Sequence, residues 1–109
     1  MITVHDVLVR ARQIISRPEA WTQGALARDK DSKKVRVSSD LAVCFCGYGA
    51  NERAALELGV RLTIYSMLRD AGEALRDATP GGRFAEFNDY YGSHAEVLTV
   101  FDKAIKDSA

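Results

Sequence analysis

The stretch LAVCFCGYGA, residues 41–50, decides the fold of this chain, because ten consecutive residues carry no charge and show no polar face. Such a run is buried, but periodicity alone does not separate a buried strand from a buried helix. Three good helix N-caps, Ser38, Ser39 and Asp40, precede the run. Its glycines and alanines let another backbone approach closely, although each glycine costs a helix about 1 kcal/mol. We therefore predict a buried helix over 41–50.

The segment before this run has a different pattern. Helical periodicity is absent from residues 21–39, where the charged turn RDKDSKK, residues 28–34, separates two short segments, 21–27 and 34–38. The second segment alternates valine with polar residues, as a strand with one buried face does. These features predict a small β-hairpin that leads into the buried helix.

An amphipathic helix is predicted at the start of the chain, over residues 4–17. Thr3 and Asp6 have the spacing of a capping box, and Pro18 ends the helix because the residue before a proline avoids helical geometry. The apolar residues at helical spacing are Val4, Val7, Leu8, Ala11, Ile14 and Ile15.

Three further helical segments follow the buried run. Residues 51–59 predict a short helical turn that ends at Gly59, and residues 60–78 carry a wide apolar stripe before TPGG, residues 79–82, ends the helix. Leu62 projects away from that stripe, so it is exposed or covered by another element or subunit. Ser93 and Glu96 form a capping box for a last amphipathic helix.

The fold class predicted from these elements is α+β but mostly α, with about four helices and one small β-hairpin. A length of 109 residues fits a single globular domain over 1–109. The predicted core comprises Leu8, Ala11, Ile15, Phe45, Ile64, Leu68, Leu75, Leu98, Phe101 and Ile105.

Composition excludes several classes of protein. Apolar residues make up 47% and charged residues 28%, which is typical of a globular chain and unlike a disordered one. Fifteen basic residues balance fifteen acidic ones, so no net field attracts nucleic acid. The start of the sequence lacks the pattern of a signal peptide and no stretch is apolar enough to span a membrane, so we expect neither. Cys44 and Cys46 lie too close in sequence for a relaxed disulfide, so we expect reduced thiols and a soluble cytoplasmic protein.

Cys46, His94 and Asp89 or Asn88 supply the residue types of a thiol nucleophile, its base and an orienting group. His94 lies on the inward side of the first turn of the last helix. However, Cys46 sits among uncharged residues, which predicts an inert buried thiol with a raised pKa.

Metal and phosphate sites are not predicted. Cys44 and Cys46 provide two ligands where zinc needs about four, and His5 and His94 would have to complete the set. The sequence CGYG lacks the lysine and the glycine spacing of a phosphate-binding loop. No cofactor is predicted.

Three short motifs each occur once in the chain: W-x-Q-G at 21–24, C-x-x-G-A at 46–50 and an aromatic-Asn-Asp at 87–89. With the closing amphipathic helix, they resemble a family of small bacterial proteins classed as a domain of unknown function. The resemblance covers nearly the whole chain and implies an α-rich single domain with no assigned activity.

The interpretation we favour is a non-enzymatic binding or interaction module that self-associates as a homo-oligomer, with an unknown small-molecule ligand or partner. The alternative is a thiol-dependent hydrolase or transferase that uses Cys46, His94 and Asp89. Asn88 and Asp89 are interpreted first as turn residues that cap backbone N–H groups. The candidate binding residues are Trp21, Gln23, Asn88, Asp89, Tyr90 and Tyr91.

Overall fold

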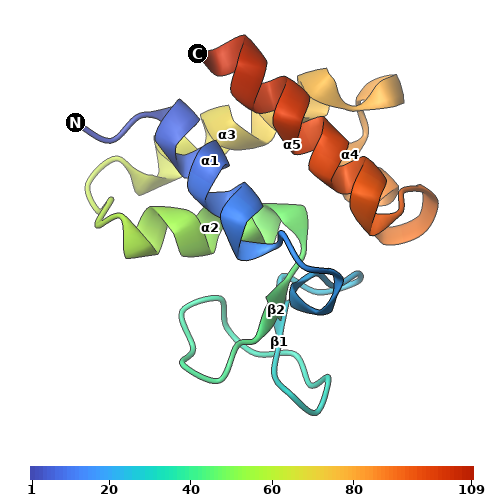
Figure 1. Ribbon diagram of the computed structural model, residues 1–109. Helices are drawn as coiled ribbons and strands as arrows, with labels where there is room; N and C mark the ends of the chain where they lie inside the picture. The colour runs from blue at the N-terminus through green and yellow to red at the C-terminus, as the bar shows by residue number, and fades with distance from the viewer.

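The computed structural model describes residues 1–109 and is mostly helical (Figure 1). There are five α-helices, whereas about four were predicted. They are Val4–Ile14 (α1), Gly47–Glu57 (α2), Ile64–Ala78 (α3), Phe84–Glu86 (α4) and His94–Ser108 (α5). Two short strands, Ala27–Arg28 (β1) and Cys44–Phe45 (β2), form an antiparallel sheet. Single turns complete the fold: the 3₁₀ turns Pro18–Ala20 (η1) and Pro80–Gly82 (η2), and the π-helical turn Phe87–Tyr91 (η3).

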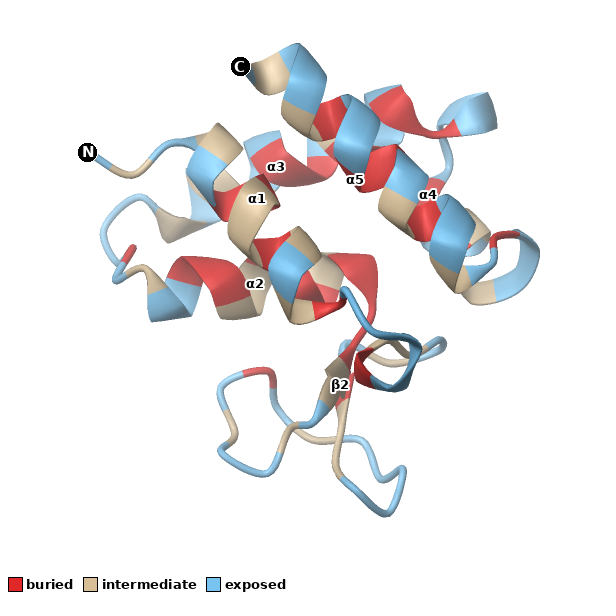
Figure 2. Ribbon diagram, in the orientation of Figure 1, coloured by how far each residue is buried: buried red, intermediate tan, exposed pale blue.

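The helices pack around one continuous apolar core. α1 contacts α2, α3 and α5, and the small sheet projects beyond the end of α1 and the start of α2 (Figure 1). Buried residues lie on the helix faces that turn toward one another, while the loops around the sheet are mostly exposed (Figure 2). The core is therefore a property of the helices, and the sheet is attached at its edge.

The helices that start with capping boxes begin where the sequence predicts. The side chains of Thr3 and Asp6 cap the start of α1, and those of Ser93 and Glu96 cap the start of α5. α1 ends at Ile14 and not at residue 17, because Pro18 starts a separate 3₁₀ turn.

The helix predicted over residues 41–50 is wrong in its first half. Residues 44–45 form β2, and α2 starts only at Gly47. Cys46 has extended backbone geometry, and its sulfur accepts a hydrogen bond from the N–H of Gly49, so this residue is the N-cap. Ser39, a predicted N-cap, instead accepts from the N–H of Leu41 in a loop.

The predicted hairpin has the wrong second strand. β1 pairs with β2, with Ala27 opposite Phe45, rather than with residues 34–38. The valine-containing segment still touches β1, because the N–H of Val35 donates to the carbonyl of Ala27 and a single bridge joins Arg28 to Lys34. A strand of two residues is too short to show alternation, so β2 could not be recognised within the uncharged run 41–50.

The middle helices differ from prediction at their boundaries. Residues 51–57 continue α2 instead of forming a separate turn, and Gly59 follows the helix end with a positive φ of 81°. α3 begins at Ile64, so Leu62 lies in the connection and is fully exposed.

The residues of the predicted core are either buried or partly buried and packed against the buried ones. Leu8, Ala11, Ile15, Phe45, Leu75 and Phe101 are buried. Ile64, Leu68, Leu98 and Ile105 are partly buried and pack against the core. Phe84, on a short helix without a sequence signal, is also buried. None of the helices combines the length and apolar character needed to cross a bilayer.

Candidate functional site

Asn88 joins three segments that are distant in sequence. Its Oδ1 accepts hydrogen bonds from the indole Nε1 of Trp21 at 2.9 Å and from the N–H of Gly47 at 3.1 Å. Its Nδ2 donates to the carbonyl of Thr22 and to Oδ1 of Asp89. Because an amide side chain has two donors and two acceptor positions, every bond that this one can make is made.

A second set of hydrogen bonds holds the loop of residues 22–26 against η3. Nε2 of Gln23 donates to the backbone carbonyl of Asn88 at 3.0 Å, and the N–H of Gly24 donates to Oδ1 of Asp89 at 3.0 Å. Asn88 and Asp89 do cap backbone N–H groups, but the groups belong to remote segments and the two residues lie in a π-helical turn. π-helical turns are frequent at functional sites.

Close backbone packing fixes the start of α2 beside this loop. A β-carbon on Gly49 would overlap the carbonyl oxygen of Leu26, which already accepts from the N–H of Cys46. A β-carbon on Gly47 would overlap the ring of Phe84. The glycines are therefore required because neighbouring groups occupy the space of a side chain.

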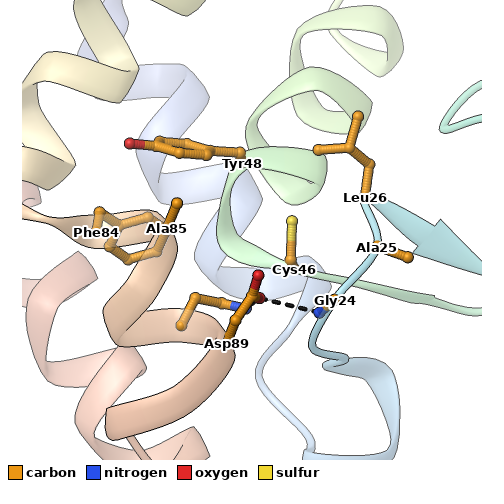
Figure 3. Close-up of a pocket in the computed structure, with 9 residues that line it drawn as sticks. Gly24, Ala25, Leu26, Cys46, Tyr48, Phe84, Ala85 and Asp89 are labelled. Atoms are coloured by element: carbon orange, nitrogen blue, oxygen red, sulfur yellow. Dashed lines mark hydrogen bonds between the residues drawn. The ribbon is translucent and has the colours of Figure 1, made fainter.

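These contacts surround a cavity of about 240 Å³ between the loop, α2 and η3. Figure 3 shows Tyr48 and Phe84 on one side, the 24–26 loop on the other, and Cys46 and Asp89 between them. Asn88 also lines the cavity. Oδ1 of Asp89 is used by Gly24 and Asn88, whereas its Oδ2 forms no hydrogen bond or ion pair within the chain.

The thiol in this cavity is not activated. Burial raises the pKa of Cys46, and the nearby carboxylate of Asp89 raises it further. Hydrogen bonds from the N–H groups of Gly49 and Tyr48 act in the opposite direction but do not reverse the shift. Cys46 is thus a protonated thiol near neutral pH.

The three motifs of the sequence therefore meet in one hydrogen-bonded cluster. A family model matches residues 1–107, and its description is a family of unknown function, DUF6197. The chain belongs to this family. No curated protein and no solved structure matches it.

In this DUF6197 member, His94 lies apart from the cavity. Its Nε2 is 2.6 Å from the carbonyl oxygen of Ile15, and its ring packs against Trp21 with 5.7 Å between centroids. His94 does not line the cavity that contains Cys46. The structure brings Cys46, Asp89 and Asn88 together and uses His94 to join α5 to the end of α1.

The other candidate residues have separate surroundings. Tyr90 and Tyr91 are exposed and stack edge to face on each other. Nδ1 of His5 lies 3.1 Å from both the carbonyl of Ile105 and the hydroxyl of Ser108. The structure places no three His, Cys, Asp or Glu side chains together as metal ligands.

Sequence reasoning missed the walls of the cavity. Leu26 and Phe84 lie in segments that carry no motif, and only tertiary packing brings them to Tyr48. Tyr48 could have been noticed as the one aromatic residue inside C-x-x-G-A.

Proposed function

We propose that the chain is a non-enzymatic binding module whose site is the cavity beside Asp89. The observation that carries this proposal is a free carboxylate oxygen of Asp89 at a cavity that is lined mostly by apolar residues and includes two aromatic ones, Tyr48 and Phe84. A carboxylate and aromatic faces both favour a cation. The ligand class that fits is a small organic cation with an apolar body.

The residues around Asp89 support binding without chemistry. The side chains of Trp21, Gln23 and Asn88 donate to one another, to backbone carbonyls and to Asp89, so they shape the site rather than touch a ligand. The protonated thiol of Cys46 adds a neutral wall.

The test is an NMR titration of the labelled protein with benzylammonium, compared with benzyl alcohol, which has the same ring and no charge. We expect benzylammonium to shift the amide signals of residues 24–26 and 46–48 and to bind about tenfold more tightly than the alcohol. Asp89→Asn is the matched variant, because its amide oxygen still accepts from Gly24 while the charge is lost. Equal binding of the two compounds, or no effect of Asp89→Asn, would contradict the proposal.

Self-association is the second part of the proposal, and the binding partner is another copy of this chain. It is supported by Leu62, in the connection before α3, and by Tyr65, three residues later in the first turn of α3, which are 101% and 87% exposed. Exposed apolar residues that are grouped mark contact surfaces more often than scattered ones. We also propose that the protein is bacterial and cytoplasmic, and the two unpaired cysteines support the cytoplasmic location.

The alternative, a thiol hydrolase or transferase, rests on one favourable feature: the sulfur of Cys46 caps the N-terminus of α2 beside a cavity. Brief alkylation with iodoacetamide near neutral pH distinguishes the two proposals. A binding module should label slowly at Cys46 and faster at the half-buried Cys44. Rapid labelling of Cys46 that His94→Ala slows would favour the enzyme.

A further inference from the structure

Asn51, in the second turn of α2, is a buried amide without a partner. The residue is 2% exposed, and neither Oδ1 nor Nδ2 forms a hydrogen bond within the chain. Buried polar side chains are nearly always hydrogen-bonded, and an exception calls for an explanation. Asn88, equally buried, makes its full set of bonds, so the contrast is specific to Asn51.

Asn51 lines a second cavity, of about 250 Å³, between α2 and α3. The remaining lining residues are Leu26, Tyr48, Glu52, Leu68 and Arg76. Leu26 and Tyr48 also line the cavity beside Asp89, so these two side chains form the wall between the two cavities.

Two residues of opposite charge, Glu52 and Arg76, line the same cavity as the amide of Asn51. Neither Glu52 nor Arg76 forms an ion pair, although seven ion pairs are present elsewhere in the chain. The guanidinium of Arg76 donates only to the hydroxyl of Tyr48, at a long 3.3 Å. An unpaired cation, an unpaired anion and an unpaired amide therefore line one cavity.

We propose that this second cavity binds a small zwitterion that carries a side-chain carboxamide, an amino-acid-like molecule. Its carboxylate would bind Arg76 and its ammonium group Glu52. Its carboxamide would exchange two hydrogen bonds with the amide of Asn51, and its methylene groups would pack on Leu26 and Leu68. This site lies beyond the Asp89 cavity and does not depend on a ligand there.

In this proposal Tyr48 and Arg76, which line the same cavity as Asn51, move to admit the ligand. Oδ1 and Nδ2 of Asn51 are enclosed, so lining side chains must shift, and the bond between Tyr48 and Arg76 is long. A carboxylate competes well for that guanidinium, because a charge-assisted bond is stronger than a bond to a neutral hydroxyl. The ligand's own carboxylate thus opens the way for its carboxamide.

The probe for this site is free L-glutamine, added to the labelled protein and followed by the amide signals of α2 and α3. Butyramide has the carboxamide without the charges, and L-glutamate has the charges without the carboxamide. We expect L-glutamine to bind at least tenfold more tightly than either compound. Equal binding of butyramide, or no signal change at tens of millimolar L-glutamine, would overturn the proposal.

Asn51→Leu separates a ligand-binding amide from a structural one. Leucine has a similar volume and no polar group, so the free variant should melt at a higher temperature than the natural protein. The same variant should lose the response to L-glutamine at least tenfold, as should Arg76→Gln, while Glu73→Gln on the exposed face of α3 should keep it. A lower melting temperature for Asn51→Leu would show that the amide stabilises the free protein, and would overturn the proposal.

Discussion

At the scale of single residues, Asn88 shows how one side chain defines a site without being available to a ligand. Its amide holds Trp21, Thr22 and Gly47 in place, so all its donors and acceptors are occupied. The free oxygen of the cluster is Oδ2 of the adjacent Asp89. Of the candidate binding residues, Asp89 is therefore the one whose side chain retains capacity for a partner inside the cavity.

Replacing Asn88 with alanine should destabilise the protein strongly. The indole N–H of Trp21 and the N–H of Gly47 would lose their acceptor in a buried place, and unsatisfied buried groups cost about 1–3 kcal/mol each. We expect a loss of about 2–4 kcal/mol in the free energy of unfolding, measured with urea. Tyr90→Ala, two residues away and exposed, should change it by less than about 0.5 kcal/mol. Equal effects of the two variants would contradict the central role of Asn88.

Cys46 should make stability depend on pH in the alkaline range. Its pKa in the folded protein is raised, mainly by burial, above the value of about 8.5 for a free thiol. Above pH 8.5 the unfolded chain loses this proton while the folded chain keeps it, so the free energy of unfolding should fall as pH rises. Cys46→Ser retains an acceptor for the N–H of Gly49 and does not titrate there. Urea unfolding at pH 7.5 and 9.5 should show a larger decrease for the natural protein than for the variant, and parallel decreases would refute this explanation.

At the scale of secondary structure, the helices with local start signals were predictable and the short strands were not. The capping boxes of α1 and α5 lie within four consecutive residues each, so the sequence contains the whole signal. β2 exists only because Ala27 and Arg28 of β1 pair with it, and no local pattern encodes that neighbour. The 41–50 prediction was correct for residues 47–50, which begin α2, and for close packing, since its small residues do meet another backbone at Gly49.

Gly49→Ala should show that this close approach is necessary. The added methyl group would overlap the carbonyl of Leu26, which is backbone and cannot move without breaking the sheet. We expect a loss of about 2–4 kcal/mol, beyond the gain in helix propensity of about 1 kcal/mol. Gly72→Ala is the matched control in α3, because its nearest neighbour is the mobile end of Arg76. Thermal unfolding should show a lower midpoint for the first variant and an unchanged or higher midpoint for the second.

At the scale of the whole molecule, the sequence predicted the components of the site better than their assembly. The motifs at 21–24, 46–50 and 87–89 are visible in the sequence, and all three contribute to the cluster. The sequence could not show that His94 turns to Ile15 instead of the thiol, because Ile15 is 79 residues away and only tertiary packing brings the two residues together. Tertiary contacts decide which candidate residues share a cavity.

Self-association should depend on the exposed start of α3. Light scattering at increasing concentration should give a mass above one chain, and Leu62→Glu should return it to one chain because a charge cannot be buried between copies at low cost. Leu41→Glu, at another exposed leucine, serves as the control and should leave the mass unchanged. A mass of one chain at all concentrations would remove self-association from the proposed function.

The bond between Trp21 and Asn88 closes a separation of 67 residues, which has a consequence for the order of folding. Closing so long a loop is entropically costly, so this contact should form after the transition state, once the helices have already packed. Trp21→Phe removes the indole N–H and should accelerate unfolding while leaving the refolding rate nearly unchanged. Because far-ultraviolet circular dichroism follows the helices, stopped-flow traces of this variant would measure both rates. If Trp21→Phe slowed refolding by the same factor by which it accelerated unfolding, the contact would already be partly formed in the folding nucleus.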